Sequence, residues 1–155
     1  MKQNSTVKER SLNPQPSVRS TAQPVAADSL DERLMAALHA AGEKKAIDPV
    51  ILDLREIASF TDYFVIVSGA NERQVQAISD EVYEQLKKSG HAAARVEGYK
   101  TAEWILLDYG DFVVHVFEQK ARKFYDLERL WRESKRVELL AEFTTDSGSS
   151  LRRES

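Results

Sequence analysis

The sequence AEWILLDYGDFVVHVFEQKARKFYDLERLW, residues 102–131, decides the fold. Its apolar runs WILL (104–107) and FVVHV (112–116) are joined by a short polar turn that contains a glycine, a pattern typical of a β-hairpin. The segment that follows predicts one helix, which begins near Ala121 or Arg122 and ends near Leu140. Both tryptophans of the protein lie in this stretch, one at the start of the first strand and one on the helix. We therefore expect the functional surface here.

Side-chain alternation divides the hairpin into two faces. A two-residue loop at Gly110-Asp111, in which the glycine supplies the positive φ of a type II′ turn, places Asp108 opposite Val113. A shift of the loop by one residue would place Asp108 opposite Asp111, a like-charge pair, but would leave the two faces unchanged. The first face is apolar and is predicted to be core: Ile105, Leu107, Tyr109, Phe112, Val114 and Val116. The second face is mixed: Trp104, Leu106, Asp108, Val113, His115 and Phe117.

The mixed face allows two interpretations. A half-polar surface anchored by a tryptophan has the composition of a binding patch. Alternatively, Trp104 and His115 lie under a helix with their polar atoms satisfied, as buried aromatic side chains commonly do. The spacing alone does not decide between a patch and a buried core.

Two strands and a helix are predicted upstream. Ser29 and Glu32 form a capping box for a helix whose leucines and alanines recur at helical spacing as far as Gly42. The apolar runs 49–54 and 63–67 predict two strands. We expect this pair to be antiparallel, because the residues between them are too few for a crossover helix.

A second helix is predicted over 72–88, with Asn71 as its N-cap and Gly90 just beyond its end. It leads into a weaker strand at 92–96, and a strand, a helix and a strand in this order imply a right-handed parallel crossover. The complete pattern predicts an α/β fold. We expect a single mixed sheet of about five strands with flanking helices, in the order α-β-β-α-β-β-β-α.

Composition and charge predict one domain with two tails. Residues 1–27 are polar, contain three prolines and carry a net charge of +3, which predicts a disordered basic tail. Residues 144–155 are predicted to be a disordered C-terminal tail without net charge, so the domain at 28–143 carries −6. Such an acidic body is a poor scaffold for non-specific nucleic-acid binding and suits a basic partner.

The sequence also indicates a compartment. No apolar run approaches the roughly 20 residues of a membrane-spanning helix, and the N-terminus lacks the apolar segment of a secretory signal. We therefore expect a cytoplasmic protein. An organellar transit peptide is disfavoured by Glu9 and by the three prolines of the first 27 residues.

Patterns that would indicate catalysis are few. The chain has no cysteine, and its three histidines, His39, His91 and His115, lack the spacing of a metal site. A metal-dependent nucleotidyl transfer needs paired carboxylates at strand ends. The sequence has single carboxylates there, without an Asp-x-Asp pair: Asp53, Asp62 and Asp108. We expect neither an enzyme nor a metal or cofactor site.

Taken together, these motifs resemble the ribosomal silencing factor family, also called RsfS or Iojap. The resemblance covers about residues 47–131. It rests on the segments LDL (52–54), TDYF (61–64), SG (68–69), RQV (73–75) and EG (97–98). The most specific segments are WILLDYGD (104–111), VHVF (114–117) and RKFYDLERLW (122–131).

The resemblance implies a mixed sheet related to the nucleotidyltransferase fold, without its catalytic signature, and a function other than catalysis. Members of the family bind the large (50S) ribosomal subunit through ribosomal protein L-fourteen, a basic protein on the subunit-joining face. They block association with the small subunit and repress translation when nutrients are scarce. By this resemblance Trp104 matches the exposed interface Trp of the family, and Asp108 and Tyr109 follow in the same motif. Three further partner-binding residues are predicted from their position on or beside the mixed face: Lys100, Glu103 and His115.

Other partners and functions remain open at this point. A small basic cluster could touch ribosomal RNA at the edge of a larger interface: Lys120, Arg122 and Lys123. One alternative is a nucleotidyltransferase-like enzyme or a nucleotide-binding protein. Another is a homodimeric adaptor that uses the Trp104 surface for self-association, and a homodimer off the ribosome is compatible with the family as well.

Overall fold

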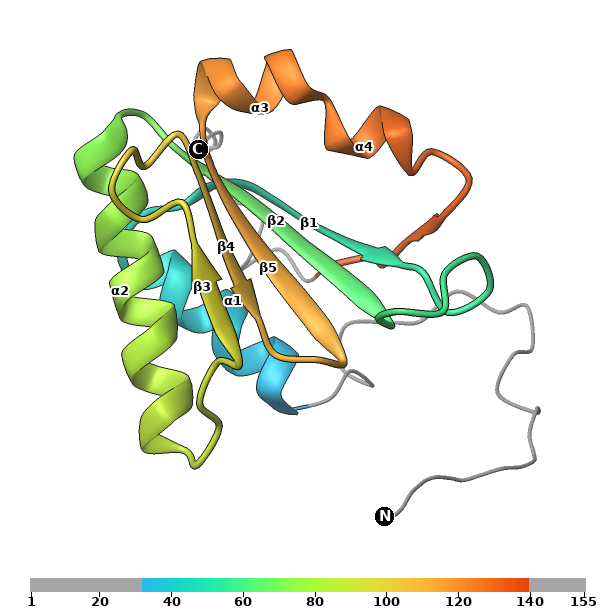
Figure 1. The fold of residues 1–155 in the computed structure, drawn as a ribbon, viewed down its shortest axis with the longest axis horizontal. Helices are drawn as coiled ribbons and strands as arrows, with labels where there is room; N and C mark the ends of the chain where they lie inside the picture. Colours follow the sequence, from blue (N-terminus) through green and yellow to red (C-terminus); the bar gives the residue numbers. More distant parts are fainter. Residues whose placement is uncertain (1–31, 140–155) are drawn as a thin grey trace, which may run out of the picture.

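The computed structural model describes residues 32–139. The predicted tails at 1–27 and 144–155 lie outside the described residues, as does Ser29 of the expected capping box. The described part of the chain is a single mixed sheet with helices on both faces (Figure 1). No helix in it is long and apolar enough to cross a membrane.

The sheet has six strands in the order β3-β4-β5-β2-β1-β6. They are β1 (Ile47–Asp53), β2 (Tyr63–Gly69), β3 (Arg95–Glu97), β4 (Trp104–Asp108), β5 (Phe112–Glu118) and β6 (Lys135–Arg136). The helices are α1 (Glu32–Glu43), α2 (Glu72–Lys88), α3 (Gln119–Tyr125) and α4 (Leu127–Leu130). This arrangement confirms the α/β class and the predicted order of the first eight elements.

The strand directions follow from the lengths of the connections. β1 and β2 pair antiparallel, as expected for their short connection. β2 pairs parallel with β5 at the centre of the sheet. α2 then carries the chain from β2 to the edge strand β3, which pairs antiparallel with β4 and therefore runs in the same direction as β2. The predicted parallel crossover therefore connects β2 to β3, and β4 and β5 lie between these two strands in the sheet.

The hairpin has the predicted register. Asp108 pairs with Val113, and Trp104 pairs with Phe117. The amide of Tyr109 donates to the carbonyl of Phe112 at 2.9 Å and closes the two-residue loop. Gly110 has φ +86, the left-handed conformation for which glycine was predicted here.

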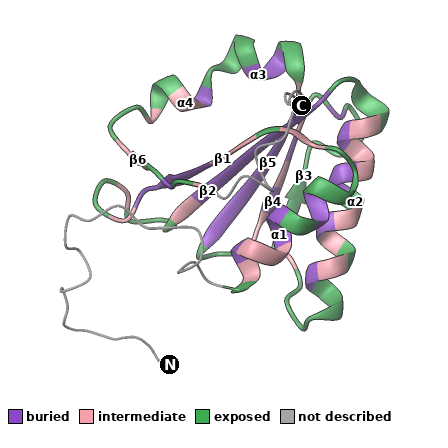
Figure 2. Ribbon diagram, turned by 180° about the vertical axis from the view of Figure 1, so that it is seen from behind, coloured by how far each residue is buried: buried purple, intermediate pink, exposed green. Residues whose placement is uncertain are grey.

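Two apolar layers stabilise the sheet. α1 and α2 pack on one face, where the whole first face of the hairpin joins their buried side chains, with Tyr109 at the margin. A smaller cluster covers the opposite face under α3 and α4, and it includes Val113, Phe117 and the partly buried Trp104. Figure 2 shows β2 and β5 buried along most of their length, whereas α3 and α4 are mainly exposed.

The ends of α2 are as predicted. The Asn71 side chain accepts a hydrogen bond from the Gln74 amide at 2.8 Å and satisfies one of the free amides of the first turn. At the other end Gly90 has φ +91, and the amide of His91 donates to the carbonyl of Leu86. This is a Schellman motif, which ends the helix.

The prediction of one long C-terminal helix was wrong. α3 ends at Asp126, whose left-handed backbone (φ 49) interrupts the helix before the single turn of α4. The chain then turns, and β6 pairs antiparallel with β1 through Lys135 and Arg136. The sheet therefore has one strand more than the predicted five. The third strand is also shorter than predicted, because only residues 95–97 pair with β4.

Candidate interaction surface

Trp104 lies at the start of β4, on the sheet face that α3 covers. Its indole ring stacks on Phe117, with ring centroids 4.9 Å apart, and contacts Tyr125 of α3 at the same centroid distance. The indole nitrogen donates a hydrogen bond to Nδ1 of His115 at 3.0 Å. The side chain is half-buried. Each interpretation of the mixed face is thus partly correct. As expected for a buried core, the indole N–H of Trp104 has a partner within the protein. As expected for a binding patch, part of the residue remains accessible to solvent.

His115 lies beneath Trp104 rather than at the surface. It is only 3% exposed and packs edge-on against Phe64, with ring centroids 4.5 Å apart. Burial in these apolar surroundings lowers the pKa of His115 to about 3, so the imidazole is neutral at physiological pH. Because Nδ1 accepts the indole hydrogen bond, the proton is on Nε2. His115 is therefore too buried for direct contact with a partner, and its hydrogen bond to Trp104 connects it to the surface.

An exposed aromatic pair extends the surface from Trp104 onto α3. Tyr125 contacts Trp104 and is 47% exposed, and Phe124 packs on Tyr125 and is 80% exposed. We call Trp104, Phe124 and Tyr125 the aromatic patch. Exposed aromatic side chains on adjoining elements are the usual anchors of protein interfaces. The sequence shows two adjacent aromatics here, but it does not show which side of α3 faces the sheet.

The other predicted binding residues are more scattered. Lys100 and Glu103 are exposed in the loop before β4, and Glu103 directly precedes Trp104. Asp108 lies at the far end of β4, where it accepts hydrogen bonds from the Gly110 amide at 2.8 Å and from Arg95 at 3.2 Å. Tyr109 points to the opposite sheet face, and burial raises its pKa to about 12. Of these residues only Glu103 is adjacent in sequence to a member of the aromatic patch.

Gly98 fixes the loop that precedes Trp104. It has φ +82, and a β-carbon on it would overlap the carbonyl oxygen of Trp104. The amide of Ala102 donates to the Gly98 carbonyl at 3.0 Å and closes the loop. The close backbone approach requires glycine at this position, and it holds the first residue of β4 in place.

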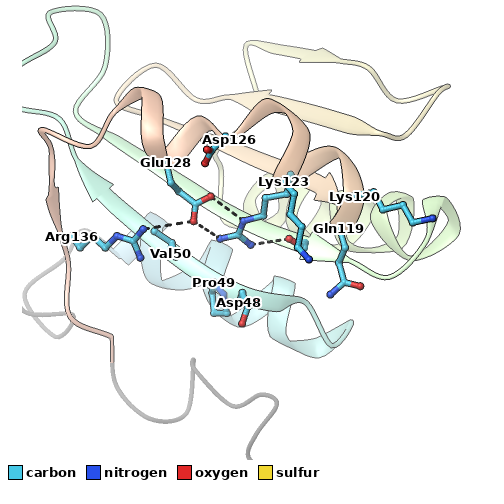
Figure 3. Close-up of a pocket in the computed structure, with 11 residues that line it drawn as sticks. Asp48, Pro49, Val50, Gln119, Lys120, Lys123, Asp126, Glu128 and Arg136 are labelled. Carbon is cyan, nitrogen blue, oxygen red and sulfur yellow. Dashed lines mark hydrogen bonds and ion pairs between the residues drawn. The ribbon is translucent and has the colours of Figure 1, made fainter.

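A cavity of about 740 Å³, lined mainly by charged and polar residues, lies between α3, α4 and the start of β1 (Figure 3). Arg122 reaches into it from α3, where Nη2 lies 3.0 Å from Glu128 and Nη1 donates to the Ser68 hydroxyl at 2.8 Å. Arg122 is therefore buried and paired, and the predicted basic cluster presents only Lys120 and Lys123 to solvent. The described residues hold no group of three carboxylates or histidines that could bind a metal.

The buried His115 gives a testable pH dependence. Its folded-state pKa lies below the value of 6.5 for a free imidazole, so between these two values the unfolded chain binds more protons than the folded one. Stability therefore falls as the pH falls through this range. We expect proton binding by His115 in the unfolded chain to lower the free energy of unfolding by about 2 kcal/mol between pH 7 and pH 5. Urea unfolding at both pH values measures it.

The control for this pH dependence is His115→Phe, which keeps an aromatic ring and removes the titration. The variant should lose about 2 kcal/mol less than the wild type on acidification, whatever its stability at pH 7. An equal loss in the two proteins would show that His115 is not buried in its neutral form.

Comparison with known proteins agrees with this architecture. The family model described as "Ribosomal silencing factor during starvation" matches residues 27–154. The ribosomal silencing factor RsfS of Halalkalibacterium halodurans is 42% identical over 111 residues, which are 72% of this chain and 95% of that protein. RsfS of Bacillus subtilis is 40% identical over 106 residues, 68% of this chain and 90% of that protein. The chloroplastic protein Iojap of Zea mays is 35% identical over 64% of this chain and 43% of its own length.

Solved structures show the same fold. A crystal structure of a protein from Bacillus halodurans matches with a TM-score of 0.63 and 42% identity, over 70% of this chain and 98% of that one. A crystal structure of a protein from Chromobacterium violaceum matches with a TM-score of 0.64 and 29% identity, over 80% of this chain and 97% of that one. The protein is a member of the ribosomal silencing factor (RsfS/Iojap) family, whose members bind the ribosome and are not enzymes.

Proposed function

We propose that this protein binds the large ribosomal subunit through ribosomal protein L-fourteen, blocks association with the small subunit and so represses translation under nutrient limitation. The aromatic patch carries the proposal. Its anchor, Trp104, is half-buried, hydrogen-bonded to His115 and stacked on Phe117, so the residue is held firmly while its accessible part faces outward. A rigid aromatic anchor beside exposed Phe124 and Tyr125 has the composition of an interface centre.

The charge of the domain supports a basic protein partner. Residues 28–143 carry a net charge of −6. Such a surface speeds the encounter with a basic protein and opposes binding to bare RNA. Glu103, exposed in the position before Trp104, is suited to a cation on the partner, and Lys100 adds a donor in the same loop. Asp108 lies at the opposite end of β4 and would contact only the rim of such an interface.

A peripheral RNA contact is compatible with this docking. Lys120 and Lys123 are exposed on α3, the helix that also carries Phe124 and Tyr125. Two lysines can neutralise RNA phosphates beside a protein interface, although they do not select a sequence. We propose that they touch ribosomal RNA next to L-fourteen, so the protein contact supplies specificity and the lysines add salt-dependent affinity.

Subunit silencing then follows from mass action. A ligand that binds only the free large subunit withdraws it from the equilibrium with joined ribosomes, so no chemical step is needed. Off the ribosome the aromatic patch is exposed, and we propose that two copies cover it by forming a homodimer. The many bacterial members of the family favour a bacterial cytoplasm as the compartment.

Cosedimentation with purified ribosomal subunits tests the proposal. The protein should pellet with 50S particles and not with 30S particles, and it should prevent added 30S from forming 70S ribosomes in a sucrose gradient. Isolated L-fourteen should bind the protein and compete with the 50S particle. Binding to 30S alone, or binding to 50S without any effect on subunit joining, would contradict the proposed mechanism.

A further inference from the structure

The indole N–H of Trp104 is satisfied inside the protein, by His115. The distance from Nε1 to Nδ1 is 3.0 Å, and the two rings lie on neighbouring strands whose registers place Leu106 opposite His115. The hydrogen bond is part-buried, so water does not readily replace the imidazole as acceptor. An indole N–H left without a partner at this depth would be unfavourable. This bond therefore selects the orientation of the indole.

His115 is itself held in one state by its surroundings. Its ring packs against Phe64 on β2 and against Phe117 on its own strand, with ring centroids 4.5 Å and 6.3 Å apart. Its Nε2 is buried without a hydrogen-bond partner among the described residues. The surrounding aromatic rings offer no charge that would stabilise a protonated imidazole. The imidazole is thus available as an acceptor at Nδ1, and an unsatisfied polar atom is retained at the other nitrogen.

We propose that His115 is the positioning residue of the docking surface: through Nδ1 it fixes the Trp104 indole in the one orientation that the ribosomal partner recognises. This inference rests on the proposed function and adds to it a residue that does not touch the partner. An unrestrained tryptophan would lose rotamer freedom when it docks, whereas this one has lost it during folding. A buried histidine with one nitrogen unpartnered stabilises the core less than an apolar ring would, and the proposal gives a reason for its presence.

A double-mutant cycle measures the positioning role. His115→Phe keeps an aromatic ring and removes the acceptor, whereas His115→Asn returns an acceptor oxygen close to the position of Nδ1. Trp104→Phe removes the indole N–H and keeps a ring. The 50S affinity of each variant is measured at pH 7, together with the ¹H–¹⁵N resonance of the Trp104 indole in the free protein.

We expect His115→Phe to weaken 50S binding by on the order of tenfold and to shift or broaden the Trp104 indole resonance. His115→Asn should recover part of both. In the Trp104→Phe background, His115→Phe should change the affinity less than about twofold, because the hydrogen bond is already absent. Thermal unfolding of each variant identifies the fraction folded, so the affinities are compared for folded protein.

The outcomes separate this inference from the proposed function. If Trp104→Phe and Trp104→Glu both bind 50S as the wild type does, the aromatic patch is not the docking site and the positioning role is overturned, whereas binding to the large subunit stands. If the wild-type protein itself does not bind 50S, the proposed function is overturned. If the Trp104 variants bind weakly but His115→Phe binds normally, only the positioning role is overturned. An equal loss from His115→Phe in both Trp104 backgrounds also overturns it, because the effect would then be one on packing alone.

Discussion

Trp104→Glu is expected to weaken 50S binding by roughly 30-fold or more, which corresponds to the ~2 kcal/mol that defines an interface hot spot. The substitution removes the large anchor of the aromatic patch and adds a negative charge to its centre. The ring contacts to Phe117 and Tyr125 are lost as well, so the variant must be shown to fold by circular dichroism. The measurement is the dissociation constant for purified 50S particles.

Two matched variants make this result decisive. Phe124→Glu introduces the same charge at a side chain that is 80% exposed, so it should weaken 50S binding with little change in stability. Ile57→Glu places the charge on an exposed apolar residue of the β1–β2 connection, outside the aromatic patch, and should bind as the wild type does. Normal binding by Trp104→Glu and Phe124→Glu, or an equal loss in Ile57→Glu, would remove the patch from the interface.

The parts of the fold that were predicted correctly are those in which local signals agree. The hairpin register, with Trp104 opposite Phe117, follows from the position of Gly110 and from the side-chain alternation of both strands. The second helix is bounded by Asn71 and Gly90, which satisfy the backbone groups at its ends. In each case the residues that determine the structure lie within a few positions of it.

The parts that were missed depend on tertiary contacts. Arg122 to Leu130 has good helix-forming residues, yet the chain breaks at Asp126, with Arg122 paired to Glu128 across the break and bonded to Ser68. Lys135 and Arg136 show no strand pattern and become β6 only because the edge of β1 is available. Neither the break nor the added strand has a local sequence signal of comparable strength.

For the site, the sequence predicted which side chains share a face of the sheet but not how deeply each is buried. Alternation placed Trp104 and His115 on one face, which is confirmed. It did not show that His115 would be buried beneath Trp104 and against Phe64 while Trp104 stays half-exposed, because burial depends on how the side chains of neighbouring strands pack over one another. The same alternation placed Tyr109 on the apolar face opposite Trp104, which is confirmed, whereas its predicted role as a binding residue came from the family resemblance. Phe124 and Tyr125 were visible in the sequence, but their exposure was not.

Gly98→Ala is expected to destabilise the protein by about 3 kcal/mol. A left-handed backbone costs an alanine roughly 1–2 kcal/mol, and overpacking typically adds about 1–3 kcal/mol. Here the added β-carbon meets the carbonyl oxygen of Trp104, a backbone atom that cannot rotate away. The free energy of unfolding in urea measures the loss. Any relief by movement of the loop would displace Trp104, so 50S binding of the folded fraction should weaken too.

Gly90→Ala is the matched control for the steric contact. Gly90 has φ +91, close to the +82 of Gly98, but a β-carbon there would have no heavy atom within 4 Å. The Gly90→Ala variant should therefore lose only the stability that a left-handed backbone costs an alanine. Its 50S binding should be unchanged, since Gly90 lies at the far end of α2 from the aromatic patch. If Gly98→Ala costs no more than Gly90→Ala, the contact with the Trp104 carbonyl does not constrain the loop. If it costs more but 50S binding per folded molecule is unaffected, the loop supports the fold without fixing the position of Trp104 for docking.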